Sequence, residues 1–280
     1  MECLIRGIPV YYQIFGSGRP VLMIHGFGPD HRLMAGCLEP VFCEHPGWRR
    51  VYFDLPGMGR TPAGDQIVDS DRMLEIVLEF IDTVLPGEKF TLAGESYGGY
   101  LARAVLKARF DQVAGLLLLC PLIIPEQQRR QLPPAQVLVR DRHFLERLSR
   151  EQQEAFDTFA VVQTETTWQR SEDEVMVGLN AADMAFLERL QLHGYPLTGA
   201  VDELPSLYQR PALFLLGRQD WIVGYRDIWP LLEDYPRATL AILDQAGHNL
   251  QIEQAELFNS LTGEWLERVA AEMSADSVEK

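Results

Sequence analysis

The sequence predicts an α/β fold: a mostly parallel sheet of about eight strands, with helices on both faces and an inserted helical lid. Short runs rich in Val, Leu and Phe alternate with helical patterns in the first 122 residues. This strand pattern disappears after Pro121 and returns at Ala212. We therefore predict a core of residues 1–122 and 205–272, a lid of residues 123–204 and a disordered tail of residues 273–280.

The predicted strands are short apolar runs without polar alternation, as expected for strands covered on both faces. In chain order they are Val10–Phe15, Pro20–Ile24, Arg50–Phe53, Lys89–Ala93, Val113–Leu119, Ala212–Leu216 and Ala238–Leu243. Helices are predicted between them. Asp71–Leu85 has apolar residues at helical spacing and ends at Pro86-Gly87, Tyr97–Arg109 follows a tight turn, and Leu250–Ala270 closes the core with an apolar face of Leu257, Leu261 and Trp265.

The lid is predicted to be helical because its segments are polar and rich in helix-forming residues. They are Pro134–Arg150, Glu151–Gln163 and Glu172–Leu190. Four lid aromatics are candidates for lining an apolar substrate pocket, although aromatics at helical spacing are also typical of a core: Phe156, Phe159, Trp168 and Tyr195.

Composition and charge narrow the possible partners. The net charge of −15 lacks the basic footprint that nucleic-acid binding requires, and it disfavours polyanionic substrates and anionic membrane surfaces. No apolar run approaches the roughly 20 residues of a membrane span. The N-terminus has no secretory signal pattern, which predicts a cytoplasmic protein. The four cysteines form no C-x-x-C pair and the histidines no metal-ligand cluster, so we expect reduced thiols and no metal.

The strongest local motif is Gly94-Glu95-Ser96-Tyr97-Gly98, a G-x-S-x-G sequence between a predicted strand and a predicted helix. In that context a serine lies on a tight turn that exposes its hydroxyl at the carboxyl edge of the sheet. Small neighbours are required there, because larger side chains would collide with the turn. The motif predicts that Ser96 is a nucleophile.

A serine nucleophile needs a base, and the base needs an acid that orients it. His248 follows the last predicted strand, so its loop can reach the same edge of the sheet as Ser96. Asp220 follows Ala212–Leu216 at a strand's carboxyl end and is the predicted acid. Asp244 is the competitor, but it is expected to serve its own loop. The resulting chain order, Ser before Asp before His, is the one expected of this α/β sheet architecture with its nucleophile on a strand-to-helix turn.

Acyl transfer also requires an oxyanion hole, two N–H donors aimed at the developing negative charge. The backbone N–H of Tyr97 is the first candidate, because it follows the nucleophile. The second should come from the loop His25-Gly26-Phe27-Gly28, with Phe27 preferred over Gly28. His25 is expected to be structural.

Five motifs in this order give the chain a clear resemblance to the α/β-hydrolase superfamily, specifically to its lid-bearing bacterial serine hydrolases. They are His25-Gly26-Phe27-Gly28, Asp54–Thr61, Gly94–Gly99, Gly217–Asp220 and Gly247-His248. The resemblance covers nearly the whole chain outside the lid. Thr61 stands where the family has Ser in a mainly structural loop. Ser96 stands where epoxide hydrolases and haloalkane dehalogenases have Asp, which argues against both activities.

The leading functional hypothesis is hydrolysis of a carboxylic ester or related acyl bond, with no cofactor and a small-molecule substrate carrying an apolar acyl or alkyl group. A carbon–carbon bond hydrolase of a vinylogous diketone, a prolyl aminopeptidase and a haloperoxidase-like side activity share the scaffold. A non-catalytic ligand-binding relative is the alternative from another class. The sequence does not indicate an oligomeric state.

Overall fold

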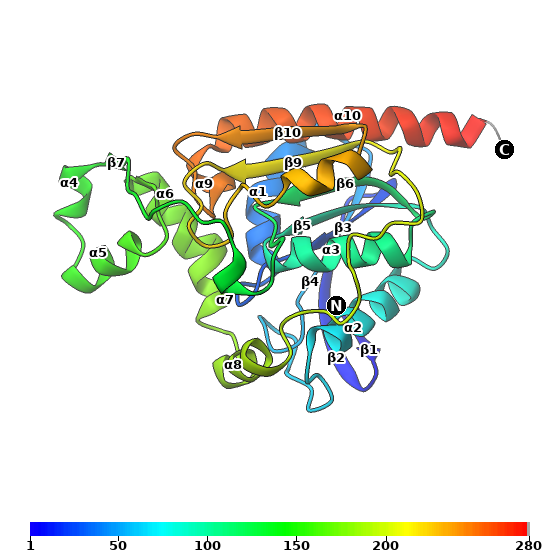
Figure 1. Ribbon diagram of the computed structural model, residues 1–280, viewed down its shortest axis with the longest axis horizontal. Coiled ribbons are helices and arrows are strands. Elements are labelled where there is room, and N and C mark those ends of the chain that lie inside the picture. The colour runs from blue at the N-terminus through cyan, green and yellow to red at the C-terminus, as the bar shows by residue number, and fades with distance from the viewer. Residues whose placement is uncertain (279–280) are drawn as a thin grey trace.

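The computed structural model describes residues 1–278 and has the predicted α/β architecture (Figure 1). Eight strands form one sheet in the order β1-β2-β4-β3-β5-β6-β9-β10. They are β1 (Glu2–Ile5), β2 (Ile8–Phe15), β3 (Arg19–Ile24), β4 (Trp48–Phe53), β5 (Phe90–Glu95), β6 (Val113–Leu119), β9 (Ala212–Gly217) and β10 (Ala238–Leu243). The pairs β1–β2 and β2–β4 are antiparallel and the other five are parallel, which confirms the predicted fold class.

Strand β1 was not predicted from the sequence. It forms a hairpin with β2 through Arg6 and Gly7, both of which have positive φ. As an edge strand it is mostly exposed, with Leu4 72% exposed, so it carries little of the apolar signal of a buried strand.

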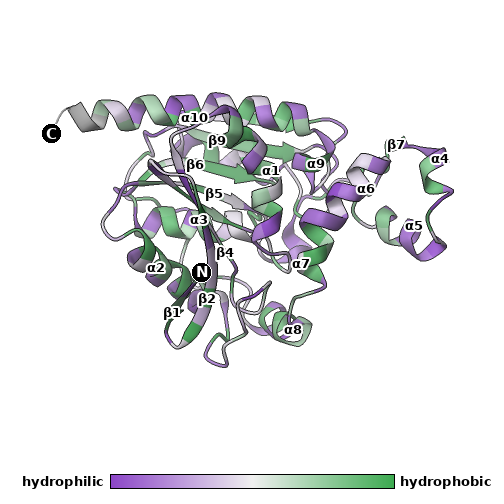
Figure 2. Ribbon diagram, turned by 180° about the vertical axis from the view of Figure 1, so that it is seen from behind, coloured by the Kyte–Doolittle hydropathy of each residue, from purple (hydrophilic) through white to green (hydrophobic). Residues whose placement is uncertain are grey.

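Helices cover both faces of the sheet, and the hydrophobic strands lie between them (Figure 2). On one face, α1 (His31–Glu44) packs against α10 (Ala255–Val278). On the other face, α2 (Ser70–Val84) packs against α3 (Tyr97–Ala108). Helix α1 was not predicted from the sequence either. It begins at His31 and is capped by Asp30, whose side chain accepts a hydrogen bond from the Arg32 amide, and it contains Pro40.

The C-terminal helix corrects two expectations. Helix α10 continues through residues 273–278, where a disordered tail was predicted; residues 279 and 280 lie outside the described part. Leu257, expected on its apolar face, is 48% exposed. A break at Gln254 separates α9 (Leu250–Glu253) from α10, and the face buried against the sheet and α1 carries Phe258, Trp265, Leu266 and Val269.

The lid is an insertion between β6 and β9, and its elements are shorter than predicted. They are η1 (Gln127–Arg129), β7 (Val139–Arg140), α4 (Arg142–Leu145), α5 (Arg150–Asp157), β8 (Val162–Gln163), α6 (Glu165–Ser171), the π-helix η2 (Glu172–Met176), α7 (Val177–Leu179) and α8 (Met184–His193). Between residues 133 and 190, no strand joins the main sheet, and β7 and β8 pair only with each other. Helices α4 and α5 project beyond the core (Figure 1).

The remaining element is η3 (Trp229–Asp234), which lies between β9 and β10. Among residues 1–278, no helix is long and apolar enough to cross a membrane.

Candidate active site

Ser96 lies at the sharp turn between β5 and α3. Its φ of 52° and ψ of −117° are sparsely populated for a residue with a side chain. The turn is crowded: a Cβ on Gly94 would lie 2.4 Å from the carbonyl oxygen of Gly98, and a Cβ on Gly98 would lie 2.2 Å from that of Ile24. Glycine at both positions therefore lets the backbone take this strained path, which directs the serine hydroxyl away from the sheet.

Ser96, His248 and Asp220 form one hydrogen-bonded chain. The Ser96 Oγ lies 2.9 Å from Nε2 of His248, and Nδ1 of His248 lies 2.9 Å from Oδ2 of Asp220. His248 follows β10 and Asp220 follows β9, so residues up to 152 positions apart meet at the carboxyl edge of the parallel strands. The structure thus brings together the three residues in the order that the sequence predicted.

Asp220 is buried and held by its own loop. Its second oxygen, Oδ1, accepts hydrogen bonds from the backbone amides of Ile222 (2.9 Å) and Val223 (3.0 Å). These bonds fix the carboxylate in the orientation that faces the imidazole. Burial alone would lower the pKa of His248, but the charge and hydrogen bond of Asp220, together with Glu95, outweigh it and raise that pKa to about 9.

Asp244, the competing acid, has a different partner. Its Oδ1 accepts a hydrogen bond of 2.8 Å from the side-chain amide of Gln219, and the oxygen of the same amide accepts from the Ala246 N–H. The residue therefore braces the loop between β10 and His248, as expected, and the imidazole faces Asp220.

The loop after β3 lies beside the nucleophile. The N–H of Gly28 donates to the sulfur of Met58 at 3.3 Å, whereas Phe27 lines the cavity above Ser96. Tyr97 is the first residue of α3, so its N–H has no carbonyl partner within the helix. The geometry is consistent with the predicted donors, Phe27 and Tyr97.

His25 has the structural role expected of it. It is fully buried, its Nδ1 lies 2.8 Å from the carbonyl oxygen of Gly26, and its Nε2 accepts from the Leu55 amide at 3.0 Å. Burial lowers its pKa, which keeps the ring neutral. The histidine thereby joins the loop after β3 to the loop after β4.

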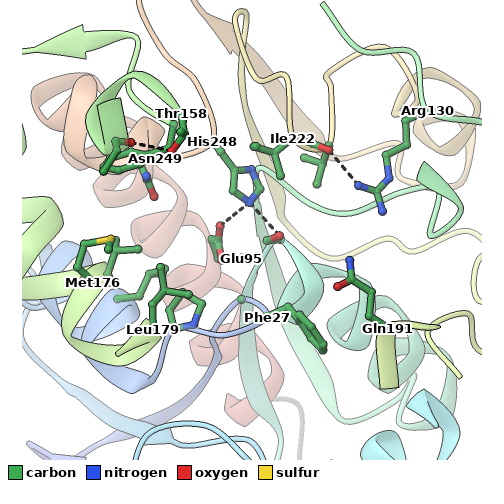
Figure 3. A pocket seen from close by; sticks show the side chains of 18 of the residues that line it. Phe27, Glu95, Arg130, Thr158, Met176, Leu179, Gln191, Ile222, His248 and Asn249 are labelled. Carbon is green, nitrogen blue, oxygen red and sulfur yellow. Dashed lines mark hydrogen bonds and ion pairs between the residues drawn. The ribbon is translucent and has the colours of Figure 1, made fainter. Parts of the chain in front are cut away.

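A cavity of about 570 Å³ opens above Ser96 between the core and the lid (Figure 3). Most of its lining is apolar and includes Phe27, Leu33, Phe159, Val175, Met176, Leu179, Tyr195, Ile222 and Val223. Polar groups are fewer: Glu95, Ser96, Arg130, Thr158, Gln191, His248 and Asn249. A cavity of this size and lining suits a small molecule with a substantial apolar part.

The four candidate pocket aromatics divide into two pairs. Phe159 and Tyr195 line the cavity. Phe156 and Trp168 do not; their rings meet edge to face at 5.0 Å inside the lid's own apolar cluster. The expectation that they bind substrate is corrected, because the two rings pack against other lid side chains and do not line the cavity. Tyr195 stacks on Tyr97 and meets Phe27 edge to face, both at 5.2 Å.

Two residues of the cavity lining, and one residue outside it, were missed from the sequence. Glu95, the variable residue before Ser96, lines the cavity beside His248. Arg130 lines it from the lid, but its guanidinium donates to the carbonyl oxygens of Ile124, Pro125 and Ile222, which occupies its nitrogens. Glu253 lies outside the cavity. Only the position of Glu95 within the G-x-S-x-G motif offered a signal in the sequence.

Glu253 joins the lid to the loop of His248. Its carboxylate accepts hydrogen bonds from the N–H of Gly247 (2.5 Å) and, on the lid, from those of Val161 (2.5 Å) and Val162 (3.2 Å). Burial raises its pKa to about 7, against the effect of these donors. The loop of the acid contacts the same lid segment, because Trp221 Nε1 donates to the carbonyl oxygen of Thr158 at 3.1 Å.

Replacing Glu253 by Gln is expected to loosen the lid. An amide offers one acceptor oxygen where the carboxylate offers two, so at least one buried N–H loses its partner, at a cost of about 1–3 kcal/mol. We expect a lower midpoint of thermal unfolding and a higher KM for bulky substrates. Glu256→Gln, which changes an exposed acid on α10, is the control. Equal midpoints for the two variants would show that the bridge contributes nothing.

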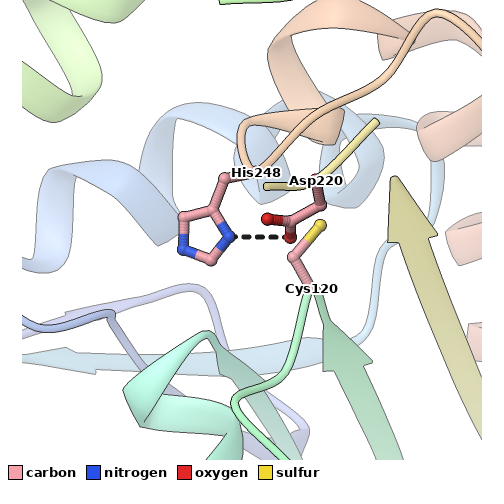
Figure 4. A group of neighbouring side chains, drawn as sticks. All are labelled: Cys120, Asp220 and His248. Carbon is pink, nitrogen blue, oxygen red and sulfur yellow. Dashed lines mark hydrogen bonds and ion pairs between the residues drawn. The ribbon is translucent and has the colours of Figure 1, made fainter. Parts of the chain in front are cut away.

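Cys120 lies beside the acid and the base, and the three side chains together resemble a metal-binding group (Figure 4). Burial raises the pKa of the Cys120 thiol well above its usual value, and the thiol donates to the carbonyl oxygen of Gly247 at 3.5 Å. A protonated thiol is a poor ligand, and both nitrogens of His248 already have partners. The group fits a hydrogen-bonded triad better than a metal site.

A second such group consists of Asp30, His31 and Asp54, whose side chains form hydrogen bonds that stabilise the fold. The Asp54 carboxylate accepts from the amide and Nδ1 of His31 and from the amide of Arg60, while Asp30 caps α1. These bonds hold the loop after β4 against the start of α1.

Comparisons with known proteins agree with this fold. The family described as "Alpha/beta hydrolase family" matches residues 21–261. The chain is 28% identical over 274 residues to 2-hydroxy-6-oxononadienedioate/2-hydroxy-6-oxononatrienedioate hydrolase of Burkholderia vietnamiensis, covering 92% of this chain and 91% of that protein. It is 26% identical over 259 residues to pimeloyl-[acyl-carrier protein] methyl ester esterase of Aeromonas salmonicida, covering 89% and 96%.

A third relative is longer than this chain. The dihydrolipoyllysine-residue acetyltransferase component of the acetoin cleaving system of Pseudomonas putida is 30% identical over 256 residues; the match covers 89% of this chain but 64% of that protein. Among solved structures, an alpha/beta superfamily hydrolase from Oenococcus oeni superimposes with a TM-score of 0.85 at 28% identity, covering 93% of this chain and 96% of the other. The fold, the order of the site residues and the family match lead to one conclusion: the chain belongs to the alpha/beta hydrolase family.

Proposed function

We propose that the protein hydrolyses a carboxylic ester or a related acyl bond through an acyl-enzyme, with Ser96 as nucleophile, His248 as base and Asp220 as the acid that orients the base. The observation that carries the proposal is the hydrogen-bonded chain from Asp220 through His248 to Ser96, at the floor of a mostly apolar cavity. A hydroxyl is a weak nucleophile at neutral pH, and this arrangement supplies the base that activates it.

In the first half of the reaction, the Ser96 oxygen bonds to the substrate carbonyl carbon and its proton passes to Nε2 of His248. The negative charge that develops on the carbonyl oxygen is stabilised by the backbone N–H groups of Phe27 and Tyr97. Asp220 stabilises the imidazolium. When the bond to the leaving group breaks, the imidazolium returns its proton to the departing alcohol, and the acyl group remains on Ser96.

In the second half, water bonds to the acyl carbon and gives a proton to Nε2 of His248. The bond to Ser96 then breaks, the serine recovers that proton and the carboxylic acid leaves. Both halves require a neutral imidazole at the start, with its single proton on Nδ1 facing Asp220.

The cavity supports a small substrate with an apolar acyl or alkyl group. Phe159 and Tyr195 supply aromatic surface from the lid, and Phe27 supplies it from the oxyanion loop. Burying one methylene group in such a lining contributes about 0.8 kcal/mol, so affinity should rise with chain length until the cavity is filled.

Carbon–carbon bond hydrolysis is the second candidate, favoured by the similarity to the Burkholderia vietnamiensis hydrolase. It would use the same triad on a vinylogous diketone. The similarity to a methyl ester esterase supports the ester reaction, and the apolar lining is compatible with both substrates. A prolyl aminopeptidase would need a group that binds an amino terminus, and none of the described lid residues that line the cavity is acidic. A ligand-binding relative would not need the strained turn at Ser96.

A turnover panel tests the proposal. It should contain short and long p-nitrophenyl esters, lactones, amino-acid anilides and a diketone ring-fission product. We expect ester turnover with KM falling as the acyl chain lengthens. Turnover of the diketone alone would assign carbon–carbon bond cleavage, and turnover of the anilides alone an aminopeptidase. Absence of turnover together with no labelling of Ser96 by a fluorophosphonate would indicate a non-catalytic protein.

A further inference from the structure

A second acid approaches the imidazole on the side of the nucleophile. Oε1 of Glu95 lies 3.3 Å from Nε2 of His248, the same nitrogen that Ser96 Oγ approaches at 2.9 Å (Figure 3). Glu95 is 2% exposed. Its other oxygen lies against the oxyanion loop, where a Cβ on Gly26 would come within 2.2 Å of it. Glu95 is thus confined between the base and the loop that would receive the substrate carbonyl.

The contact between Glu95 and His248 requires a proton. Nδ1–H of His248 is directed at Asp220, so in the neutral ring Nε2 carries a lone pair. A carboxylate facing that lone pair would be repelled. The contact is favourable when the Glu95 carboxyl donates its proton to Nε2, or when an imidazolium N–H donates to the Glu95 carboxylate. In both forms the lone pair of Nε2 is engaged, by a hydrogen bond from the Glu95 carboxyl or by a bonded proton, and cannot accept the proton of Ser96.

We propose that Glu95 is a positioning residue that retains this proton on the Nε2 side of His248, so that Ser96 becomes nucleophilic only after the pair has released it to solvent. The inference rests on the proposed role of His248 as base. It makes the residue before the nucleophile the determinant of the pH at which the enzyme becomes active. Below that pH the site is complete in geometry but lacks a free base.

The charges around the pair indicate the direction of the effect. Burial raises the pKa of Glu95 to about 7, and Asp220 and Glu95 raise that of His248 to about 9. Both shifts favour the protonated form, so activity should increase as pH rises through this range. Without the Glu95 carboxylate, one contribution that raises the pKa of His248 is lost, and the increase should occur at lower pH.

Other titratable and charged groups face the pair from neighbouring elements, and the experiment must distinguish their effect on the pH dependence from that of Glu95. Asp220 and Cys120 lie at the ends of β9 and β6, and Arg130 and Tyr195 belong to the lid. Glu253 on α9 is the main rival, because its pKa is also raised to about 7. Glu253→Gln is therefore the matched control: it too removes one acidic group near the site, but one that bonds to backbone amides instead of His248.

The experiment compares wild type, Glu95→Gln and Glu253→Gln from about pH 5.5 to about pH 10, a range that spans the relevant pKa values. The readout is the rate constant for phosphonylation of Ser96 by a fluorophosphonate, alongside kcat/KM for p-nitrophenyl acetate. For Glu95→Gln, we expect the rise of the phosphonylation rate constant with pH to occur about one to three pH units lower than in wild type. For Glu253→Gln, we expect the midpoint of that rise to equal the wild-type one. An unchanged pH dependence in Glu95→Gln, or a shift in Glu253→Gln alone, overturns the proposal.

If Glu95→Gln fails to fold, the proposal can still be tested by a measurement on the wild-type protein. Nitrogen-15 NMR of labelled histidine should show that Nε2 of His248 loses hydrogen-bonded proton character in the same pH step in which phosphonylation accelerates. A lone pair on Nε2 free of any proton well below that step would overturn the proposal. Phosphonylation requires no ester, so a shifted pH dependence without ester turnover supports the role of Glu95 while refuting the ester assignment. Ester turnover in wild type, combined with an unchanged pH dependence in Glu95→Gln, supports the ester assignment and refutes the role of Glu95.

Discussion

Ser96→Ala is expected to abolish covalent labelling by fluorophosphonates and to lower ester turnover by about 10⁶, as removal of a serine nucleophile does in an unrelated hydrolase. The reason is that no other hydroxyl replaces Ser96 Oγ at 2.9 Å from the base. Alanine keeps a Cβ of the same size at the strained turn, so the fold should remain intact. Burst kinetics with p-nitrophenyl acetate measures the loss, and far-ultraviolet circular dichroism verifies the fold.

Retention of full activity by a folded Ser96→Ala protein would contradict the assignment of the nucleophile. A residual rate well above the uncatalysed one is compatible with it, because the oxyanion donors and the cavity still bind and orient substrate for attack by water. The residual rate should not show a burst, since no acyl-enzyme can accumulate.

Asp220→Asn should lower turnover by up to about 10⁴ while leaving the fold in place, by analogy with the serine-protease triad. The amide oxygen can still accept from the amides of Ile222 and Val223, which directs the amide NH₂ at His248 Nδ1. The imidazole then carries its proton on Nε2, the wrong tautomer for accepting a proton from Ser96. Both kcat and the labelling rate should fall.

Asp244→Asn is the matched control, because it makes the same chemical change one loop away. Asp244 accepts from the side chain of Gln219 and does not contact the imidazole. We expect turnover within about tenfold of wild type, a change of under about 1.4 kcal/mol in the activation barrier. A larger loss in Asp244→Asn than in Asp220→Asn would reverse the roles of the two acids.

Local patterns in the sequence were sufficient for the fold class and for the order of the site residues. Apolar runs mark buried strands irrespective of what lies around them, and a residue directly after such a run lies at the carboxyl edge of a parallel sheet. Together with the G-x-S-x-G motif around Ser96, that rule selected Ser96, Asp220 and His248, with Asp244 as the competing acid. Elements without a strong local signal were missed: β1 is an exposed edge strand, and α1 contains a proline.

Tertiary structure alone decided what lines the cavity and what tunes the base. Phe156 and Phe159 are three residues apart in one lid segment, yet one is buried in the lid and the other faces the substrate cavity. The sequence pattern is compatible with either outcome. The packing of Phe156 against other lid side chains buries it, whereas Phe159 lines the cavity. In the same way, Glu95 occupies a position in its motif where the motif requires no particular residue. Its effect on His248 arises only because the folded chain buries Glu95 and places the two side chains 3.3 Å apart.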